Sequence, residues 1–199
     1  MKKFKLTSEF IVDISGVKLF RIKALIEFGN VKAGDLGGYI EKEENLSHMG
    51  DAWVSDDARI SGNAQVFGNA QVFGDAWVFG NARVFGNAWV SGNARVFGDA
   101  QVSGNARVYG NARVSGDAQV FGDARVSGDK DYAYAHGFGS CNRTTTFFRL
   151  KDGDVGVRCG CFYGTLAQFR DKVCETHGET KKAQEYLMLA DLMEIRFKN

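Results

Sequence analysis

The residues best suited to proton transfer in this chain are its three histidines, His48, His136 and His177. An imidazole titrates with a pKa of about 6.5, so it can accept or donate a proton near neutral pH. General acid–base catalysis is therefore the chemistry that these side chains could perform. None of them lies within residues 50–127, the most regular part of the sequence. We expect His48 and His136 to be ordinary residues at the two ends of that segment.

Cysteines are the second group that could do chemistry. Cys159 and Cys161 are predicted to share one face of a strand, whereas Cys141 and Cys174 lie elsewhere in the last third of the chain. A structural zinc site usually combines two paired motifs, and this sequence has only one. We therefore predict buried free thiols, no metal site and a reducing compartment.

The regular segment consists of thirteen six-residue words from Gly50 to Ser127, most of the form Gly-(Asn/Asp)-Ala-x-Val-(Phe/Ser). The alanine and the valine or isoleucine keep their type in every copy, and their spacing of two places them on one face of a strand. A packed core tolerates little change of size, so these residues are predicted to point inward. The variable residues between and after them are predicted to point outward. Glycine and Asn or Asp are predicted at the corners, where unusual backbone angles cost them little.

This word resembles the repeat of the hexapeptide-repeat family, whose members form a left-handed parallel β-helix with three hexads in each triangular coil. The resemblance covers residues 50–127 and implies about four coils and, at about 4.8 Å per strand layer, a prism roughly 20 Å tall. Residues 18 apart then stack, so Asp57 should lie near Asp75 and Asp99 near Asp117, with solvent screening their charges. The whole chain also resembles uncharacterised proteins of phage, prophage and gut-bacterial genomes, with a similar lead-in and a CGCFYGTLAQF-like tail.

The ends of a solenoid need covers, because its terminal layers have unpaired strand edges. Residues 1–49 are predicted to form an N-terminal β cap and lead-in, with two strands joined at Ser15-Gly16. In the lead-in, Ile40 and Leu46 are six apart but two residues out of phase with Val54, so the first turn should be irregular.

Residues 128–199 are predicted to form a small C-terminal α+β cap. It contains a hairpin that turns at Asp152-Gly153 and a helix that begins at Thr165, with Gln168 in the capping-box position. Gly178 suits the end of that helix, and Thr180 begins a second one. The predicted fold class is thus mainly β, a parallel β-helix closed by two caps.

Composition excludes several classes of partner. Lys and Arg number 25 against 24 Asp and Glu, and the hexads hold six Arg, no Lys and seven Asp. Because affinity for phosphate rests on accumulated positive charge, we expect no nucleic-acid partner. No apolar run approaches the roughly 20 residues that cross a bilayer, so we expect no membrane partner. The basic start MKKFKLTSEF lacks the apolar stretch of a signal peptide, which favours a cytoplasmic protein.

Hexapeptide-repeat proteins are best known as acyltransferases. The resemblance implies for such an enzyme a histidine as general base, and coenzyme A bound between neighbouring subunits of a trimer. Here the hexads contain no histidine and no inserted loop, so the base would have to come from a cap, as His136 or less readily His48. We expect no cofactor and keep the acyltransferase as the alternative reading.

The outward residues sort into three columns whose members are 18 apart, and every column carries aromatic rings. Exposed apolar patches are normally small, and Trp, Tyr and Arg dominate binding hot spots. The column with the least charge is predicted to form an oligomer interface, a trimer by family resemblance, through Phe67, Phe85 and Phe121. The predicted binding residues for another partner are Trp77, Phe79, Arg95, Phe97, Arg113, Trp53 and Trp89.

These observations favour a non-catalytic binding scaffold that self-associates and holds a protein or small-molecule partner. The phage-like resemblance suggests an accessory role, such as interference with a bacterial defence protein or capture of its signal. Fold analogy alone cannot name the partner, because function resides in sites that the fold only carries.

Overall fold

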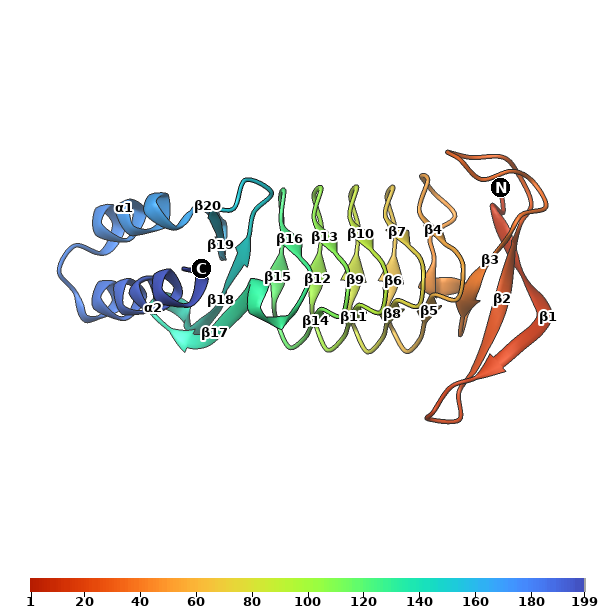
Figure 1. Cartoon of the computed structure of the whole chain (residues 1–199), viewed down its shortest axis with the longest axis horizontal. Helices are drawn as coiled ribbons and strands as arrows, with labels where there is room; N and C mark the ends of the chain where they lie inside the picture. The colour runs from red at the N-terminus through yellow and green to blue at the C-terminus, as the bar shows by residue number, and fades with distance from the viewer. Residues whose placement is uncertain (199) are drawn as a thin grey trace.

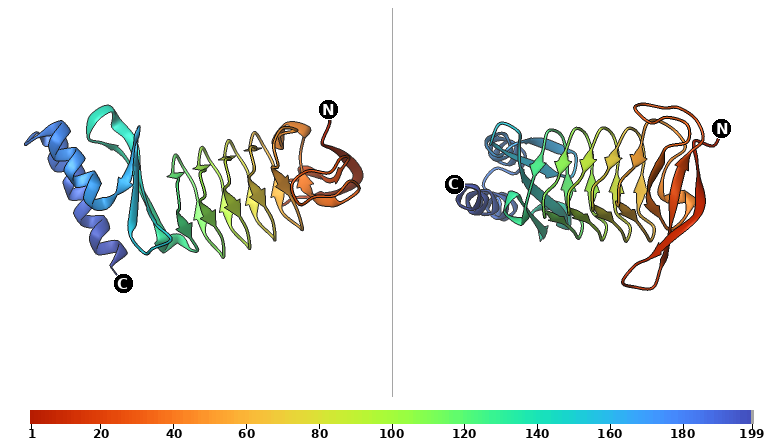
Figure 2. Two further views of the ribbon diagram at one scale, coloured as in Figure 1. Left: turned by 90° about the horizontal axis from the view of Figure 1, so that it is seen from above. Right: turned by 45° about the vertical axis from the view of Figure 1, so that its right-hand side comes forward.

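The computed structural model describes residues 1–198, and for Cys141 it describes the backbone alone. The molecule is elongated, with an N-terminal β cap at one end, a solenoid in the middle and a C-terminal cap at the other (Figure 1). The two helices lie at the far end, and a four-stranded sheet stands between them and the solenoid (Figure 2). The mainly β fold with two caps is therefore confirmed.

Each hexad contributes one two-residue strand, and every third strand pairs in parallel. Partners are 18 residues apart, as Gln71 with Trp89 and Trp77 with Arg95. Three parallel stacks result, in the orders β4-β7-β10-β13-β16, β5-β8-β11-β14 and β6-β9-β12-β15. The strands are β4 (Trp53–Val54), β5 (Arg59–Ile60), β6 (Gln65–Val66), β7 (Gln71–Val72), β8 (Trp77–Val78), β9 (Arg83–Val84), β10 (Trp89–Val90), β11 (Arg95–Val96), β12 (Gln101–Val102), β13 (Arg107–Val108), β14 (Arg113–Val114), β15 (Gln119–Val120) and β16 (Arg125–Val126).

The core of the solenoid is built from the two residues that never change type. All thirteen alanines, from Ala52 to Ala124, and the valines or isoleucine two positions later are at most 1% exposed. A stack of identical small residues leaves no room for a different one, since protein interiors are packed as densely as organic crystals. Constant residue type at these positions is thus a direct consequence of the prism's narrow interior.

The corners need glycine for two reasons. Twelve of the thirteen hexads open with a glycine whose φ lies between +61° and +72°, a region that other residues avoid. A side chain there would also meet the glycine of the next coil: a Cβ on Gly86 would come within 3.1 Å of the amide nitrogen of Gly104. Asp56 replaces glycine in the remaining hexad, with φ 55°, and its Oδ2 accepts a hydrogen bond from the backbone N–H of Gly74 at 2.9 Å.

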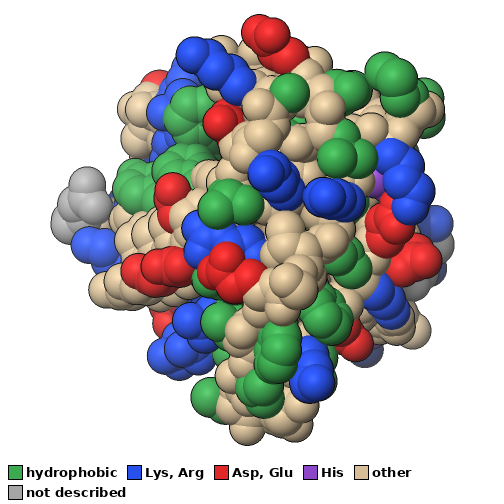
Figure 3. All heavy atoms as spheres, turned by 90° about the vertical axis from the view of Figure 1, so that its right-hand side faces the viewer, with side chains coloured by type: hydrophobic (Ala, Val, Ile, Leu, Met, Phe, Trp, Pro, Cys, Tyr) green, Lys and Arg blue, Asp and Glu red, His purple; other side chains and the backbone are tan. Residues whose placement is uncertain are grey.

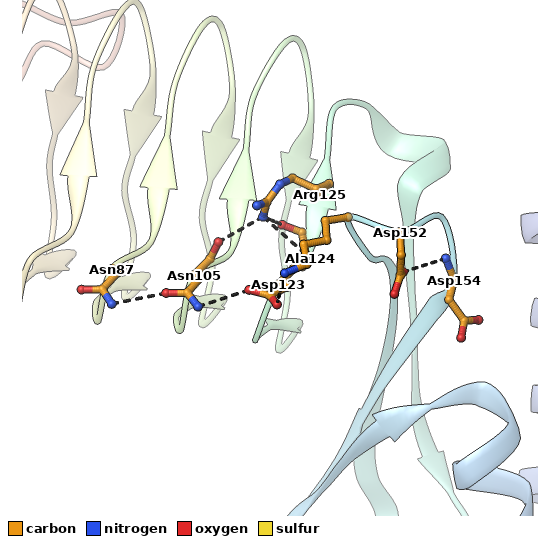
Figure 4. A network of polar contacts seen from close by, with 8 residues as sticks. Asn87, Asn105, Asp123, Ala124, Arg125, Asp152 and Asp154 are labelled. Carbon is orange, nitrogen blue, oxygen red and sulfur yellow. Dashed lines mark hydrogen bonds and ion pairs between the residues drawn. The ribbon is translucent and has the colours of Figure 1, made fainter.

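Asparagines next to the corner glycines form ladders along the outside of the solenoid. The Nδ2 of Asn69 donates to Asn87 at 3.1 Å. Asn87 donates in turn to Asn105 at 3.3 Å, and Asn105 donates to the carboxylate of Asp123 at 3.2 Å (Figure 4). An amide both donates and accepts, so it can stand inside such a ladder, whereas a carboxylate only accepts and ends it. Asp123 also pairs with Lys151 of the C-terminal cap, at 3.0 Å.

A second ladder runs up a neighbouring corner. The Nδ2 of Asn63 donates to Asn81 at 3.2 Å, and Asn81 donates to Asp99 at 3.0 Å. The prediction for the corners concerns stacked aspartates, whereas the hydrogen bonds come from asparagines. These ladders reinforce the 18-residue register on the outside, in addition to the backbone hydrogen bonds that join the corners of successive coils, such as that from the N–H of Asn69 to the carbonyl of Gly86 at 2.8 Å.

The N-terminal cap consists of β1 (Phe4–Val12) and β2 (Lys18–Ala24), which pair in antiparallel fashion, and β3 (Leu36–Ile40). The turn between β1 and β2 contains Ser15 and Gly16, as predicted. On its other edge β3 pairs in parallel with β5, and this joins the cap to the solenoid.

The lead-in forms one more coil below the first complete one. Ile40 lies beside Ile60 and Leu46 beside Val66, so both pairs are 20 residues apart instead of 18. The two extra residues fall between Leu46 and Val54, and they explain the irregular first turn. A short 3-10 helix, η1 (Glu43–Asn45), lies just before Leu46. The solenoid therefore has about five turns, one more than the hexads alone supply.

Backbone carbonyls at the N-terminal end are capped by side-chain donors. Lys3 is 1% exposed, and its Nζ donates to the carbonyls of Ala52 at 2.7 Å and Gly50 at 3.2 Å. Asn45 is fully buried, and its Nδ2 donates to the carbonyls of Ala64 at 2.8 Å and Gly62 at 3.1 Å. Buried polar groups need such partners, so these two residues close the open edge that the sequence analysis expected a cap to cover.

Lys3 should make the free energy of unfolding vary with pH in the alkaline range. Burial lowers the pKa of Lys3 to about 8 from an ordinary value of 10.5, although Asp51 opposes the shift. Between these values the unfolded chain binds more protons than the folded chain, so the free energy of unfolding should rise with pH, by up to about 1.4 kcal/mol per unit.

Urea denaturation at pH 7 to 10.5 should show this rise in the wild type, and the rise should be absent from Lys3→Met. That variant should also be about 1–3 kcal/mol less stable at pH 7, because two carbonyls lose their donor. Equal slopes in both proteins would contradict the prediction.

The C-terminal cap is a four-stranded antiparallel sheet covered by two helices. Its strands are β17 (Tyr132–Phe138), β18 (Arg143–Arg149), β19 (Val155–Cys159) and β20 (Phe162–Thr165), and its helices are α1 (Leu166–His177) and α2 (Lys181–Phe197), with short 3-10 turns η2 (Asp129–Asp131) and η3 (Ser140–Asn142). Neighbouring residues of β18 face opposite sides: Phe148 packs into the solenoid core, and Phe147 packs under the helices. The sheet is thus a wall shared by two cores.

The local signals of this cap are confirmed. The hairpin β18–β19 turns through Asp152 and Gly153. Thr165 Oγ1 accepts from the backbone N–H of Gln168 at 3.3 Å, and Gln168 Oε1 accepts from that of Thr165 at 2.9 Å, which is the predicted capping box. Gly178 ends α1, and Thr180 caps α2 by accepting from the backbone N–H of Ala183.

Backbone N–H groups at the C-terminal end of the solenoid are capped by acceptors. Asp129 accepts from the N–H of Arg113, Thr146 from that of Gln119 and Asp131 from that of Ser127, each at 2.9 Å.

The outer surface of the N-terminal end carries basic and acidic side chains mixed with apolar ones (Figure 3). Such charges discourage end-to-end pairing of solenoids. Among residues 1–198, no helix is long and apolar enough to cross a membrane.

Candidate binding surface

The outer surface of the solenoid has three faces, and each is one column of outward side chains. We call the stack of β4, β7, β10, β13 and β16 the first face, that of β5, β8, β11 and β14 the second, and that of β6, β9, β12 and β15 the third. The observed register reproduces the predicted columns. The faces differ only in the residues between Ala and Val and after Val, so any function of the wall resides there.

The second face carries a continuous strip of aromatic rings and guanidinium groups. The rings of Phe79 and Phe97 stack at 5.0 Å with an interplanar angle of 3°, and Trp77 lies 4.6 Å from Phe79. The guanidinium of Arg95 lies 5.9 Å from the Trp77 ring, and the Trp77 Nε1 donates to Ser61 Oγ at 3.3 Å. The rings are half-buried, whereas Arg95 and Arg113 are exposed. The structure therefore brings together the predicted residues of this face.

The third face has a similar stack that does not include all three predicted phenylalanines. Phe67 and Phe85 stack at 4.9 Å with an interplanar angle of 2°, and the guanidinium of Arg83 lies 5.2 Å from the Phe67 ring. Phe121 is separated from them by Ser103 and contacts the C-terminal cap, where Tyr163 meets it edge-on at 5.1 Å. Phe121 is therefore partly covered by its own chain.

On the first face, Trp89 is 40% exposed and stands between two hollows of about 390 Å³ each. Arg107 lies 4.4 Å from its ring, and Phe73 meets it edge-on at 6.0 Å. Tyr109 and Arg125 line one hollow, although the sequence analysis did not select them. Their place in the column with Trp89 was the available signal, since residues 18 apart stack.

Trp53, at the start of the same face, is not exposed, so the prediction that it belongs to the binding surface is wrong. Its side chain is 4% exposed and is covered by Phe28 of the N-terminal cap, whose ring meets it edge-on at 5.4 Å. The physical reason is that the loop between β2 and β3 folds down over the first strand. Trp53 instead joins the core that links the cap to the solenoid.

Comparison with known families agrees with this architecture. The family model described as "YdcK Beta solenoid repeat" matches residues 76–92, 88–104 and 100–116, all within the hexads. The hexads of this chain form a β-solenoid. The match extends over the middle of the solenoid and leaves both caps outside. A search of the curated proteins found no match to this β-solenoid protein.

His48 has both ring nitrogens engaged in structural contacts. Its Nδ1 accepts from the backbone N–H of Lys3 at 3.1 Å, and its Nε2 lies 2.6 Å from Glu43 Oε1. These partners fix the tautomer with the proton on Nε2. The ring also stacks on Phe4 at 4.4 Å. His48 thus holds the N-terminal cap of the β-solenoid protein against its first coil.

His136 lies on β17, and its side chain is 60% exposed. Its Nδ1 lies 2.9 Å from Thr144 Oγ1 and 3.8 Å from Asp117 Oδ2. His48 and His136 are at opposite ends of the β-solenoid and do not form one site. His136 is therefore accessible to solvent, and it lies on an open surface.

The cysteines differ from the prediction of buried thiols. Cys161 and Cys174 are exposed and Cys159 is half-buried, all three as free thiols, while the side chain of Cys141 lies outside the described residues. Cys159 ends β19, but Cys161 lies in the tight turn before β20, so the two do not share one face of a strand. In the part of the chain that the structure describes, no three His, Cys, Asp or Glu residues are grouped for a metal ion.

Proposed function

We propose that this chain is a non-catalytic binding scaffold that presents its outer faces to partners. The observation that supports this most is the strip of Trp77, Phe79, Arg95 and Phe97 on the second face. Aromatic rings fixed by stacking lose little conformational entropy on binding, and exposed arginines beside them offer hydrogen bonds and charge. The rigid solenoid holds these groups in register, as a binding surface requires.

The alternative, an acyltransferase, has weaker support. It needs a histidine free to take a proton from an acceptor, within reach of bound coenzyme A. Both ring nitrogens of His48 are already hydrogen-bonded, and His136 stands on an open strand surface. An arrangement of this kind fits structural roles for the two histidines better than catalysis.

Self-association through the third face is part of the proposal, with a trimer favoured by the hexapeptide-repeat resemblance. The stacked pair Phe67 and Phe85 with Arg83 would form the contact, whereas Phe121 contributes less because its own cap covers part of it. We also propose a cytoplasmic location and an accessory role in phage or prophage, in which the second face captures a defence protein or its signal. The whole-chain resemblance is the support for that role.

Replacing Phe67 and Phe85 together with glutamate should convert the oligomer to monomers. Two carboxylates would be buried in each contact with one guanidinium, that of Arg83, beside them. At least one carboxylate would therefore stay unpaired, and burying an unpaired charge is costly. Native mass spectrometry and light scattering of the purified wild type and variant measure the number of subunits directly.

The matched control is Trp77→Glu, Phe79→Glu, which places the same charges on the second face and should leave the oligomer intact. A wild-type monomer, or an unchanged oligomer in the Phe67→Glu, Phe85→Glu variant, would disprove the third-face interface. The same spectra test the scaffold against the enzyme: added acetyl coenzyme A should leave the mass of the scaffold unchanged, whereas a stoichiometric adduct would support the acyltransferase.

A further inference from the structure

The C-terminal cap contains a cavity of about 260 Å³ on the far side of its sheet from the solenoid. Its lining residues come from α1, α2 and the turn between β19 and β20, among other segments of the cap. This place is remote from the outer faces of the solenoid, and no part of the proposed function uses it.

One wall of the cavity is a chain of aromatic rings. Phe162 lies 5.5 Å from Phe169, Phe169 meets Tyr186 edge-on at 5.7 Å, and His177 stacks near Tyr186 at 5.8 Å. Val173 adds an aliphatic surface between them. Aromatic rings prefer the edge-on and offset arrangements seen here, so a planar ring in the cavity would find neighbours of a kind that it packs against well.

The cavity is preformed because Tyr186 is held in one position. Its hydroxyl oxygen accepts from the backbone N–H of Ser140 at 3.1 Å and donates to the Ser140 carbonyl at 3.3 Å. Gly139 makes this possible: a Cβ there would overlap the Tyr186 ring. Glu185 Oε2 fixes the same loop by accepting from the Gly139 N–H at 2.8 Å. A ligand would therefore meet a wall that needs no rearrangement.

The charged groups of the cavity are all potential cations. Arg143, Lys172 and His177 line it, and among the described residues no carboxylate does. The Arg143 side chain lies over Gly160, where a Cβ would come within 2.8 Å of Nη1. Lys172 pairs with Glu175 at 2.8 Å, but both side chains are exposed, so this pair is weak and exchangeable. An anionic group at the mouth would gain charge-assisted hydrogen bonds.

We propose that this cavity binds a small planar aromatic molecule that carries an anionic group, with its ring against Phe162, Phe169 and Tyr186 and its anion at Arg143 and Lys172. Drug-sized ligands occupy pockets of about 300–1,000 Å³, so the volume suits one ring or a fused pair. A cationic ligand of the same shape is disfavoured, since it would meet the positive side chains of Arg143 and Lys172 and no carboxylate among the described lining residues. This inference goes beyond the proposed function and is independent of it.

Thiol protection tests the site in the unmodified protein. Cys161 lines the cavity and is exposed, whereas Cys174 is also exposed but is not among the residues that line it. The rate at which iodoacetamide alkylates each of the two cysteines is followed by peptide mass spectrometry. It is measured in the presence of 2-naphthoate or 2-naphthyl phosphate at about 1 mM, a concentration that saturates sites of micromolar affinity. Bound ligand should slow alkylation of Cys161 at least about fivefold by blocking access, and Cys174 should react at an unchanged rate.

Variants then test the charges. Arg143→Gln should raise the concentration of probe needed for protection about tenfold, because a charge-assisted hydrogen bond is lost. Lys181→Gln removes an exposed charge on α2 outside the cavity and should have no effect. Protection by the phosphate alone or by the carboxylate alone identifies the anion and supports the site in either case.

Three results would overturn the proposal. They are no protection of Cys161 by either anion, equal protection by 2-naphthylmethylammonium, or equal affinity in Arg143→Gln and the wild type. The number of subunits does not enter this readout, so its failure would leave the scaffold proposal standing.

Discussion

Replacing Gly104 with alanine should lower the free energy of unfolding by about 2–4 kcal/mol, a large effect for one methyl group. Two costs add. The residue has φ +71°, where a Cβ costs about 1–2 kcal/mol, and the new Cβ would come within 2.8 Å of the amide nitrogen of Gly122 on the next coil. Backbone cannot yield there without breaking the register of the stack. Urea or thermal denaturation followed by circular dichroism measures the loss.

Gly153→Ala is the matched control for the backbone angle alone. Gly153 has φ +90° in the hairpin turn, and a Cβ there would meet nothing within 4 Å. It should cost only the conformational part, about 1–2 kcal/mol. If Gly104→Ala is no more destabilising than this control, contact between successive corner glycines does not limit the sequence, and the explanation for their uniformity is wrong.

Enlarging a side chain in the inner column of alanines should destabilise the fold about as much as Gly104→Ala. Ala88→Leu adds three carbon atoms to a fully buried position in the middle of the prism, between Ala70 and Ala106 of the neighbouring coils. Overpacking a dense core usually costs about 1–3 kcal/mol, and we expect the upper end of this range because the walls are hydrogen-bonded on both sides. The same denaturation experiments report it.

Gln65→Leu provides the comparison, since it introduces leucine on the exposed side of β6. Its stability should stay within about 0.5 kcal/mol of the wild type, as for most surface substitutions. Similar stability losses at positions 65 and 88 would mean that the assignment of inward and outward residues has no energetic basis.

Inward and outward residues could be assigned from the sequence because the packing constraint recurs in every hexad. Ala and Val are constant at positions where the interior is narrow, and their spacing specifies both the strand face and the length of a coil. The hairpin at Asp152 and the capping box of Thr165 and Gln168 were also predictable, because each depends on residues close together in the chain.

Contacts between residues far apart in the sequence produce no periodic pattern from which they could be predicted. Nothing near Lys3 in the sequence indicates burial, because its acceptor carbonyls belong to residues 47 and 49 positions away. Trp53 has the neighbours of an exposed residue, and only the cap loop that carries Phe28 buries it. The cavity of the C-terminal cap likewise depends on how two helices and a hairpin meet, which periodicity does not describe.

The asparagine ladders were a missed signal of a different kind. The sequence predicts asparagine only as a corner residue tolerant of unusual backbone angles, and the prediction for the stacked corners concerns aspartates, whose like charges repel. The discriminating fact was the order within a column: Asn69, Asn87 and Asn105 precede Asp123, so donors lie before the acceptor that ends the series. Sorting corner residues by coil would have shown it.

The 18-residue register also constrains how such a gene can change length. Every hexad supplies the same Ala and Val to the interior, so the core would accept the loss of a single hexad between Trp77 and Arg95. The outside would not: Arg95 would leave the column of Trp77 and join that of Gln71, and the C-terminal cap would turn by one face relative to the N-terminal cap. Loss or duplication of a whole coil keeps every column intact. We therefore expect descendants of the same ancestral gene to differ in the solenoid by multiples of 18 residues.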